Sequence, residues 1–409
     1  MTATRLLVAS TLALMLASCS RPPEPLPPVA PAPALRVESL ATPAGAGSAQ
    51  PSLALDARGR ALLSWLEPLP TGGKALRFAT FEGDHWSPAL SIVEGAGLLA
   101  NWADTPSMAA AGGDRLAAVW PALQREGSEG YDVHVALSSD AGATWSEAIT
   151  PHRDGTETEH DFASLVPGTD GSLGVLWLDG RANATTPPGA GAQALMAAFI
   201  ASDGTLGPEL TLDPRVCDCC ATAAVATDGG IVAAYRDRSA DEVRDIAVIR
   251  QRAATWGSGS VVHPDGWKIA GCPVNGPALA AAGDRVALAW FAEPESGARV
   301  SLAISTDGGS TFGAPLRIDE GRPLGRVDVT LLADDSALVG WIELDDEGAS
   351  FRARRMPSMA GTTEALVIAR VETGRAGGFP RLIRSGGSIL AAWTAREGDS
   401  TRVLTARLR

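Results

Sequence analysis

The 409-residue chain has little cysteine, little tyrosine and a deficit of positive charge. It contains five cysteines and two tyrosines, and its formal net charge is −13. A strongly acidic surface disfavours nucleic acids and anionic lipids as partners. Long stretches of helical periodicity are also absent, which argues against an α-helical fold. What remains is a chain rich in short apolar segments separated by Gly and Asp turns.

The one long apolar run lies at the N-terminus. Arg5 is the only charge before residue 21, and "LLVASTLALMLA" follows it, ending in "LASC" at Cys19. The run is too short for a transmembrane helix, and the "LASC" ending resembles a bacterial lipobox. We therefore expect residues 1–18 to be a lipoprotein signal peptide and Cys19 to be lipidated; an ordinary secretory signal is the alternative. Ser20 favours sorting to the outer membrane of a Gram-negative cell envelope.

The segment that follows is rich in proline. Residues 19–34 include "SRPPEPLPPVAPAPA", which cannot pack a core and is typical of a stiff, extended tether. We expect the folded domain to occupy residues 35–409.

Seven copies of one unit fill this domain. In each, an apolar segment, a Gly/Asp turn and a second apolar segment end in an aromatic residue, as in "PSLALDARGRALLSWLEP". The spacings between successive aromatics are 55, 57, 58, 55, 51 and 52 residues, and the aromatics are Trp65, Trp120, Trp177, Tyr235, Trp290, Trp341 and Trp393. So narrow a spread indicates a repeat architecture.

Each unit holds about four strand-like runs, which is the pattern of a β-propeller blade. The last unit stops after its third strand, "TRVLTARLR", whereas "LRVESLAT" near residue 35 is one strand without a blade. The sequence therefore predicts an all-β, seven-bladed β-propeller of four-stranded blades. Its N-terminal strand closes the last blade, because closure removes an open sheet edge.

Two turns between third and fourth strands share a motif, "SSDAGATW" and "STDGGSTF". They resemble the Asp box of the sialidase-like (BNR-repeat) propellers, and the chain looks like an uncharacterised exported branch of that family. The resemblance implies a structural role, away from the ligand, for Ser138, Asp140, Gly142, Trp145, Ser305, Asp307, Gly309 and Phe312. If the boxes lie on one face, the links between blades and the second-to-third-strand turns lie on the other, which we name the loop face.

The loop face gathers the unusual polar residues, so it is the expected binding site. Sialidase-type enzymes hold a substrate carboxylate with arginines and use carboxyl groups for acid catalysis. The resemblance therefore suggests catalytic roles for Asp218, Asp237, Arg236, Arg244 and Arg181. Ligand-binding roles are suggested for His160, Asp179, Arg326, Arg381 and Asn275.

The chain also departs from the sialidase pattern. It has no Arg-Ile-Pro motif, it has seven units instead of six, and Tyr235 occupies the position of a repeat tryptophan. Whether the protein is an enzyme stays open; if it is, the expected activity is glycoside hydrolysis.

Four cysteines crowd the loop face: Cys217, Cys219 and Cys220 in "VCDCC", and Cys272 in "GCPVNG". In an oxidising envelope they favour two disulfides, although adjacent cysteines make the second bridge strained. Thiolates at this spacing would otherwise bind Cu(I), or Zn(II) with His160 nearby, or stay free and redox-active.

These patterns predict a monomeric, lipid-anchored envelope protein whose loop face binds a small or carbohydrate ligand with an acidic group. The alternatives are a scaffold for an envelope protein partner and a copper- or zinc-handling protein.

Overall fold

The computed structural model describes residues 35–409 except 96, 169, 187–190 and 358–362. The expected signal peptide, Cys19 and the tether lie outside the described residues. Leu35–Arg409 forms one compact unit. No helix in the described part of the chain is long and apolar enough to cross a membrane.

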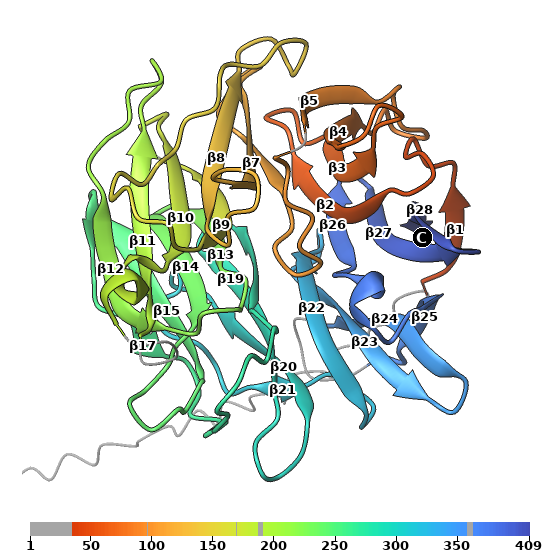
Figure 1. Ribbon diagram of the computed structural model, residues 1–409. Coiled ribbons are helices and arrows are strands. Elements are labelled where there is room, and N and C mark those ends of the chain that lie inside the picture. The colour runs from red at the N-terminus through yellow and green to blue at the C-terminus, as the bar shows by residue number, and fades with distance from the viewer. Residues whose placement is uncertain (1–34, 96, 169, 187–190, 358–362) are drawn as a thin grey trace, which may run out of the picture. The chain divides into compact units, whose positions relative to one another are not determined.

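The unit is a seven-bladed β-propeller, as the repeats predict (Figure 1). All pairs within the blades are antiparallel. Blade 1 holds β2 (Ala49–Leu55), β3 (Ala61–Pro68), β4 (Lys74–Thr80) and β5 (Leu90–Gly95); blade 2 holds β6 (Ser107–Ala110), β7 (Leu116–Leu123) and β8 (Tyr131–Ser138). Blade 3 holds β9 (His160–Pro167), β10 (Leu173–Asp179), β11 (Gln193–Ile200) and β12 (Leu210–Val216), with the 3₁₀ helix η1 (Arg181–Thr185) after β10.

The remaining blades follow the same plan. Blade 4 holds β13 (Ala223–Thr227), β14 (Gly230–Arg236), β15 (Ile246–Arg252), β16 (Thr255–Trp256) and β17 (Ser260–Val261). Blade 5 holds β18 (Ala278–Ala282), β19 (Arg285–Ala292), β20 (Arg299–Ser305) and β21 (Leu316–Arg317). Blade 6 holds β22 (Pro323–Leu331), β23 (Ala337–Asp345), β24 (Gly348–Met356) and β25 (Leu366–Val371), and blade 7 holds β26 (Arg381–Ser385), β27 (Ser388–Glu397), β28 (Ser400–Leu408) and β1 (Val37–Leu40), preceded by η2 (Arg375–Gly377).

The predicted closure is confirmed. Val37 on β1 pairs with Leu408 on β28, so the first strand completes the last blade (Figure 1). In blade 2 the fourth-strand position is marked by an isolated bridge, Val135 to Ile149.

The repeat aromatics lie between blades and form the core. Trp65, Trp177, Trp290 and Trp341 are at most 1% exposed. The indole N–H of Trp65 donates to Glu67, that of Trp177 to Asp179 and that of Trp341 to Glu343, so a carboxylate two residues after the tryptophan satisfies the buried donor.

The first strands of the blades line a central channel of about 560 Å³. At the loop face, apolar residues from the links between blades join one packed cluster, including Trp102, Phe162, Cys219, Val274 and Phe379. Phe162, near the start of β9, has a left-handed backbone conformation (φ 48°) at an irregularity of the β9–β10 pairing.

Candidate functional site

The four cysteines of the described chain meet at one place on the loop face, which we name the cysteine cluster. The Sγ atoms of Cys217, Cys219 and Cys220 lie within 4.8 Å of one another, and Cys272 contacts Cys219 and Asp218. Cys217 and Cys220 are buried, Cys219 is half-buried and Cys272 is exposed. The cluster therefore runs from solvent into the interior.

The described residues contain no disulfide, and all four of these cysteines are free. Cys217 Sγ lies 3.2 Å from Cys220 Sγ and 3.9 Å from Cys219 Sγ. A disulfide requires about 2.05 Å. The two expected disulfides are therefore not seen, and the four sulfurs are thiols instead.

Positive charge stands directly beside the sulfurs. Arg244, which is 3% exposed, donates from Nη1 to Cys217 Sγ and to Asp218 Oδ1, both at 3.2 Å. Hydrogen bonds with the Cys219 and Cys220 thiols, aided by the charge of Arg236, overcome burial and hold the pKa of Cys217 well below its usual range. Burial raises the pKa of Cys220. A hydrogen bond with Cys219 also lowers the pKa of Cys272, so the thiolate form is favoured at Cys217 and Cys272 over Cys220.

Arg236 is a structural residue of the blade 4 to blade 5 junction. Its guanidinium donates to the carbonyls of Asn275, Arg244 and Phe291 at 2.6–2.9 Å, and stacks over Trp267 at 4.7 Å. It is 1% exposed, so no donor faces a ligand.

Arg326 is similarly occupied. It donates to the carbonyls of Gly374 and Gly378 and stacks over Trp102 at 5.0 Å. Asn275 accepts the Arg326 backbone N–H on Oδ1 at 2.7 Å, joining blades 5 and 6. These contacts position the links and leave neither side chain free for a ligand.

Arg381 differs from the other predicted arginines because it lines the channel. Its side chain lies near Phe379, at 6.0 Å from the ring, and near the buried Asp328. Its Nε atom is buried without a hydrogen-bond partner.

Arg181 and Asp179 form an ion pair at the end of β10. Arg181 Nη2 lies 2.7 Å from Asp179 Oδ2 and also pairs with Glu209. Asp179 is the blade 3 counterpart of Glu67 and Glu343, since it accepts the Trp177 indole N–H. Its position is thus explained by the repeat.

The two remaining acids predicted on the loop face lie around the cysteines. Asp218 is 37% exposed on its side chain and pairs with Arg244 and Arg238. Asp237 accepts the Arg238 backbone N–H, and burial raises its pKa. Asp218 is the one acid that shares space with Cys219 and Cys272.

His160 lies in a different cluster. Its Nε2 is 2.9 Å from Asp154 Oδ2, and its ring stacks on His152 with centroids 3.7 Å apart. Asp132 lies at the edge of both rings. Among the described residues, no set of candidate metal ligands joins a histidine to a cysteine. His152 lies eight residues before His160, and this pair of histidines was the sequence signal that could have indicated the cluster.

A group of buried acids between blades 2 and 3 was missed by the sequence reasoning. Tyr131 donates its hydroxyl to Asp161 at 3.1 Å, and burial together with nearby Asp104 raises the pKa of Asp161. Burial raises the pKa of Asp104 to about 7. Their burial, at 3% exposure or less, could not be read from the link sequence.

The two Asp-box turns fold as hydrogen-bonded loops on the opposite face. Asp140 accepts from Thr144 and Ser138, and Asp307 accepts from Thr311 and Ser305. Hydrogen bonds from Thr144 and Ser138 lower the pKa of Asp140 to about 2. The carboxylates of Asp140 and Asp307 therefore find their hydrogen-bond donors within their own turns.

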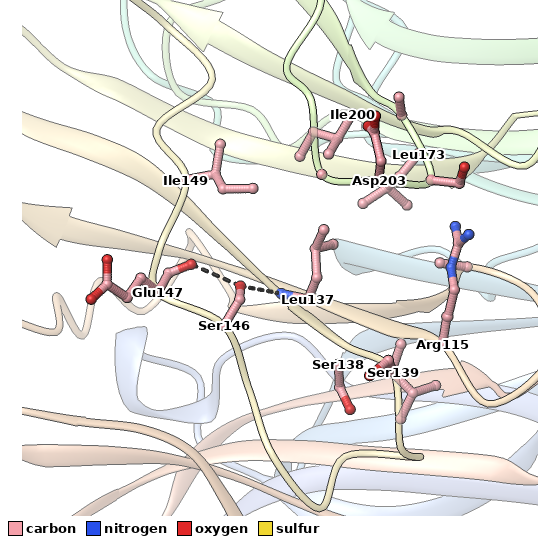
Figure 2. A pocket seen from close by; sticks show the side chains of 15 residues that line it. Arg115, Leu137, Ser138, Ser139, Ser146, Glu147, Ile149, Leu173, Ile200 and Asp203 are labelled. Atoms are coloured by element: carbon pink, nitrogen blue, oxygen red, sulfur yellow. Dashed lines mark hydrogen bonds between the residues drawn. The ribbon is translucent and has the colours of Figure 1, made fainter.

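A groove of about 380 Å³ lies beside the first box (Figure 2). Leu137, Ile149, Leu173 and Ile200 line it, and Arg115, Glu147 and Asp203 provide charged groups. Ser146 bridges the Leu137 and Glu147 backbones at its edge (Figure 2).

Comparison with known proteins supports the fold. No family model matches this chain, and no curated protein matches it. Among solved structures, the polysaccharide lyase Uly1 aligns with a TM-score of 0.53 and 9% identity, over 86% of this chain and 88% of that one. A protein of unknown function from Dyadobacter fermentans gives 0.49 and 14%, over 92% and 100%. Trypanosoma rangeli sialidase gives 0.48 and 11%, over 92% of this chain and 60% of the sialidase.

At sequence identities of 9–14%, these alignments show only that the proteins share a fold. The chain has a propeller architecture, and the alignment with the polysaccharide lyase Uly1 supports this fold.

Proposed function

We propose that this chain is a cell-envelope protein that binds Cu(I) through the cysteine cluster. The observation that carries the proposal is the meeting of three sulfurs at 3.2–3.9 Å around a low-pKa thiol, with a fourth cysteine at the surface. Thiolate ligands select soft ions, of which Cu(I) is one.

The spacing supports a three-coordinate ion. With metal–sulfur bonds of about 2.3 Å, sulfurs stand about 4 Å apart in a trigonal site and about 3.8 Å apart in a tetrahedral one. The Cys217–Cys219 separation of 3.9 Å fits either arrangement, whereas the Cys217–Cys220 separation of 3.2 Å is shorter than both and has to widen when the ion binds. Cys272 is grouped with Cys219 and Asp218 and not with Cys217 and Cys220, so four sulfurs do not surround one point. This favours three-coordinate Cu(I) over tetrahedral Zn(II).

The local charges support the same ion. Three thiolates and one Cu(I) carry a net charge of −2 after the thiols release their protons. The guanidinium groups of Arg244, 3.2 Å from Cys217, and of Arg236, buried beside it, place positive charge next to the sulfurs, and Arg244 also pairs with the carboxylates of Asp218 and Glu242. A buried charged site needs such compensation.

The arginines of the loop face support this function over carboxylate recognition. The guanidinium groups of Arg236 and Arg326 donate their hydrogen bonds to backbone carbonyls, and Arg181 forms ion pairs with Asp179 and Glu209. A sugar carboxylate would have to displace these buried contacts to be bound bidentately.

As part of this proposal, Cys19 carries a lipid in the outer membrane and residues 20–34 hold the propeller away from the bilayer. The exposed Cys272 would then face the aqueous compartment from which the ion arrives.

The test is an anaerobic competition titration of the reduced chain with a chromophoric Cu(I) chelator. We expect one Cu(I) per chain, and at least about 100-fold weaker binding in Cys219→Ser, since even loss of a group that only supports a metal ligand costs 10–100-fold. Ser310→Ala, far from the cluster on a box turn, is the control. Binding by Cys219→Ser equal to the unaltered chain would refute the assignment.

A second candidate is a carbohydrate ligand with an acidic group in the central channel. It rests on Arg381, whose Nε lacks a partner, and on Asp104, a buried carboxyl with a pKa near neutrality at the channel wall. Such a carboxyl can act as a general acid in glycoside hydrolysis.

This candidate predicts saturation-transfer NMR signals from sialic acid or glucuronic acid with the unaltered chain, and their loss in Arg381→Gln. Equal signals from both proteins, or none from either, would exclude it.

A further inference from the structure

A second group of metal-ligating side chains lies where blade 2 meets blade 3. Asp132 comes from β8, His152 from the link, and His160 begins β9. We name these three residues the histidine cluster. The Asp132 Oδ1 atom is 3.6 Å from His152 Nε2 and 3.7 Å from His160 Nδ1. One ligand atom of each residue thus lies within a single small volume.

The two histidine nitrogens that face this volume are unsatisfied. His152 Nε2 and His160 Nδ1 are buried without any hydrogen-bond partner. His160 is fully buried, and His152 is 7% exposed. Buried polar atoms normally have partners, so two orphan nitrogens directed at one carboxylate oxygen indicate a missing cation or water.

Hydrogen bonding sets the state of His160. A carboxylate can only accept, so the 2.9 Å contact between His160 Nε2 and Asp154 Oδ2 places the ring proton on Nε2. In the neutral ring, Nδ1 then carries the lone pair, and that lone pair faces Asp132. Metal-binding histidines are commonly oriented by a carboxylate in this way.

Negative charge is in excess around the two rings. Asp132, Asp154, Asp179 and Glu209 supply four carboxylates, and Arg181, paired with the last three, supplies one guanidinium. With neutral imidazoles the group carries −3, and a divalent cation would reduce this to −1. Coulomb attraction between buried groups favours that change.

We propose that Asp132, His152 and His160 form a site for a divalent cation of the Zn(II) class, separate from the cysteine cluster. Two imidazoles and one carboxylate are a ligand set that zinc accepts with a further position open. Asp132, 22% exposed on its side chain, is the edge through which the ion enters.

Binding changes the stacking of the rings. The rings are parallel to within 2°, with centroids 3.7 Å apart. Two parallel lone pairs cannot meet at one ion, so one ring turns out of the stack while Asp132 closes on the ion. The Gln124 side-chain amide donates a hydrogen bond to Asp132 Oδ1 at 2.7 Å, which orients this carboxylate.

The experiment is a Zn(II) titration of the full chain, observed through ¹⁵N-labelled histidine rings by NMR. The chain has five histidines, so their ring signals can be resolved. We expect two rings to change, one through Nε2 and one through Nδ1. Zn(II) held only by the cysteines would leave all five unchanged and overturn the inference. The readout is independent of whether the cysteine cluster binds Cu(I).

Two variants identify the ligands. Asp132→Asn keeps the shape of the side chain but removes its charge, and should weaken the histidine response at least tenfold in Zn(II) concentration. Asp84→Asn is the matched control, because Asp84 contacts His85 at 2.6 Å on the exposed surface. An unchanged titration in Asp132→Asn would also overturn the inference.

Discussion

Replacement of Arg236 by methionine is expected to destabilise the propeller severely. The side chain makes four hydrogen bonds of 2.6–2.9 Å to three carbonyls and covers Trp267. Methionine retains much of the apolar volume but leaves these carbonyls unpaired. Each unpaired group costs about 1–3 kcal/mol. Because partial relaxation reduces the sum, we expect a loss of about 4 kcal/mol in the free energy of unfolding.

This loss can be expressed as a melting temperature. For the 375 residues from Leu35 to Arg409, the unfolding entropy is roughly 0.8 kcal/mol/K, so the melting temperature should fall by about 5 °C. The assay is differential scanning calorimetry, supported by urea unfolding. Arg58→Met is the control, since Arg58 is 59% exposed and pairs only with Asp114. Equal melting temperatures for Arg236→Met and the unaltered chain would refute the structural role and restore Arg236 as a ligand-binding candidate.

Three further predictions follow from single residues. Gly142→Ala should lower the free energy of unfolding in urea by at least about 2 kcal/mol, because φ of Gly142 is +87° and the added Cβ would stand 2.3 Å from Phe78. Gly112→Ala is the control: its φ is +92° but the space around it is open, so we expect a loss of only about 1 kcal/mol. Equal losses in the two variants would contradict the packing of the box turn against Phe78. Burial raises the pKa of Asp104 to about 7, so its stabilising effect is complete below pH 4 and is lost as pH rises through about 7. Across this window the free energy of unfolding should fall by on the order of 4 kcal/mol more in the unaltered chain than in Asp104→Asn, and parallel profiles would contradict this. Cys272→Ser should slow the transfer of Cu(I) to a chelator about tenfold while changing the Cu(I) affinity little, since this exposed cysteine lies outside the set of three sulfurs. Stopped-flow transfer rates equal to those of the unaltered chain would show that Cys272 does not take part in releasing the ion.

The architecture was predictable because the repeat is local. An aromatic residue every 51–58 residues, a last unit that stops after its third strand and a single strand at the N-terminus specify seven blades and their closure, and both are confirmed. The box turns were predictable for the same reason, since their hydrogen bonds join residues two to four positions apart.

The roles of the arginines were not predictable in this way. Whether Arg236 faces a ligand or the carbonyl of Phe291 depends on the link packed against it from 39 to 55 residues away. Left-handed residues such as Phe162 in β9 and Arg326 in β22 lie at irregularities of the strand pairing, and nothing in their side chains signals this conformation.

The histidine cluster shows the same limit. His152 and His160 share one link, but Asp132 reaches them from β8 of the preceding blade. Only the packing of blade 2 against blade 3 brings the three together.

The most direct test of Cu(I) binding is the native mass of the chain after anaerobic purification from a copper-supplied bacterial envelope. Cys19 is replaced by serine so that four cysteines remain. We expect the fully reduced mass plus one copper, and an X-ray absorption spectrum with three sulfur neighbours at about 2.3 Å from the copper. A copper-free mass lowered by the hydrogens of two disulfides would contradict it and make "CDCC" a staple between blades.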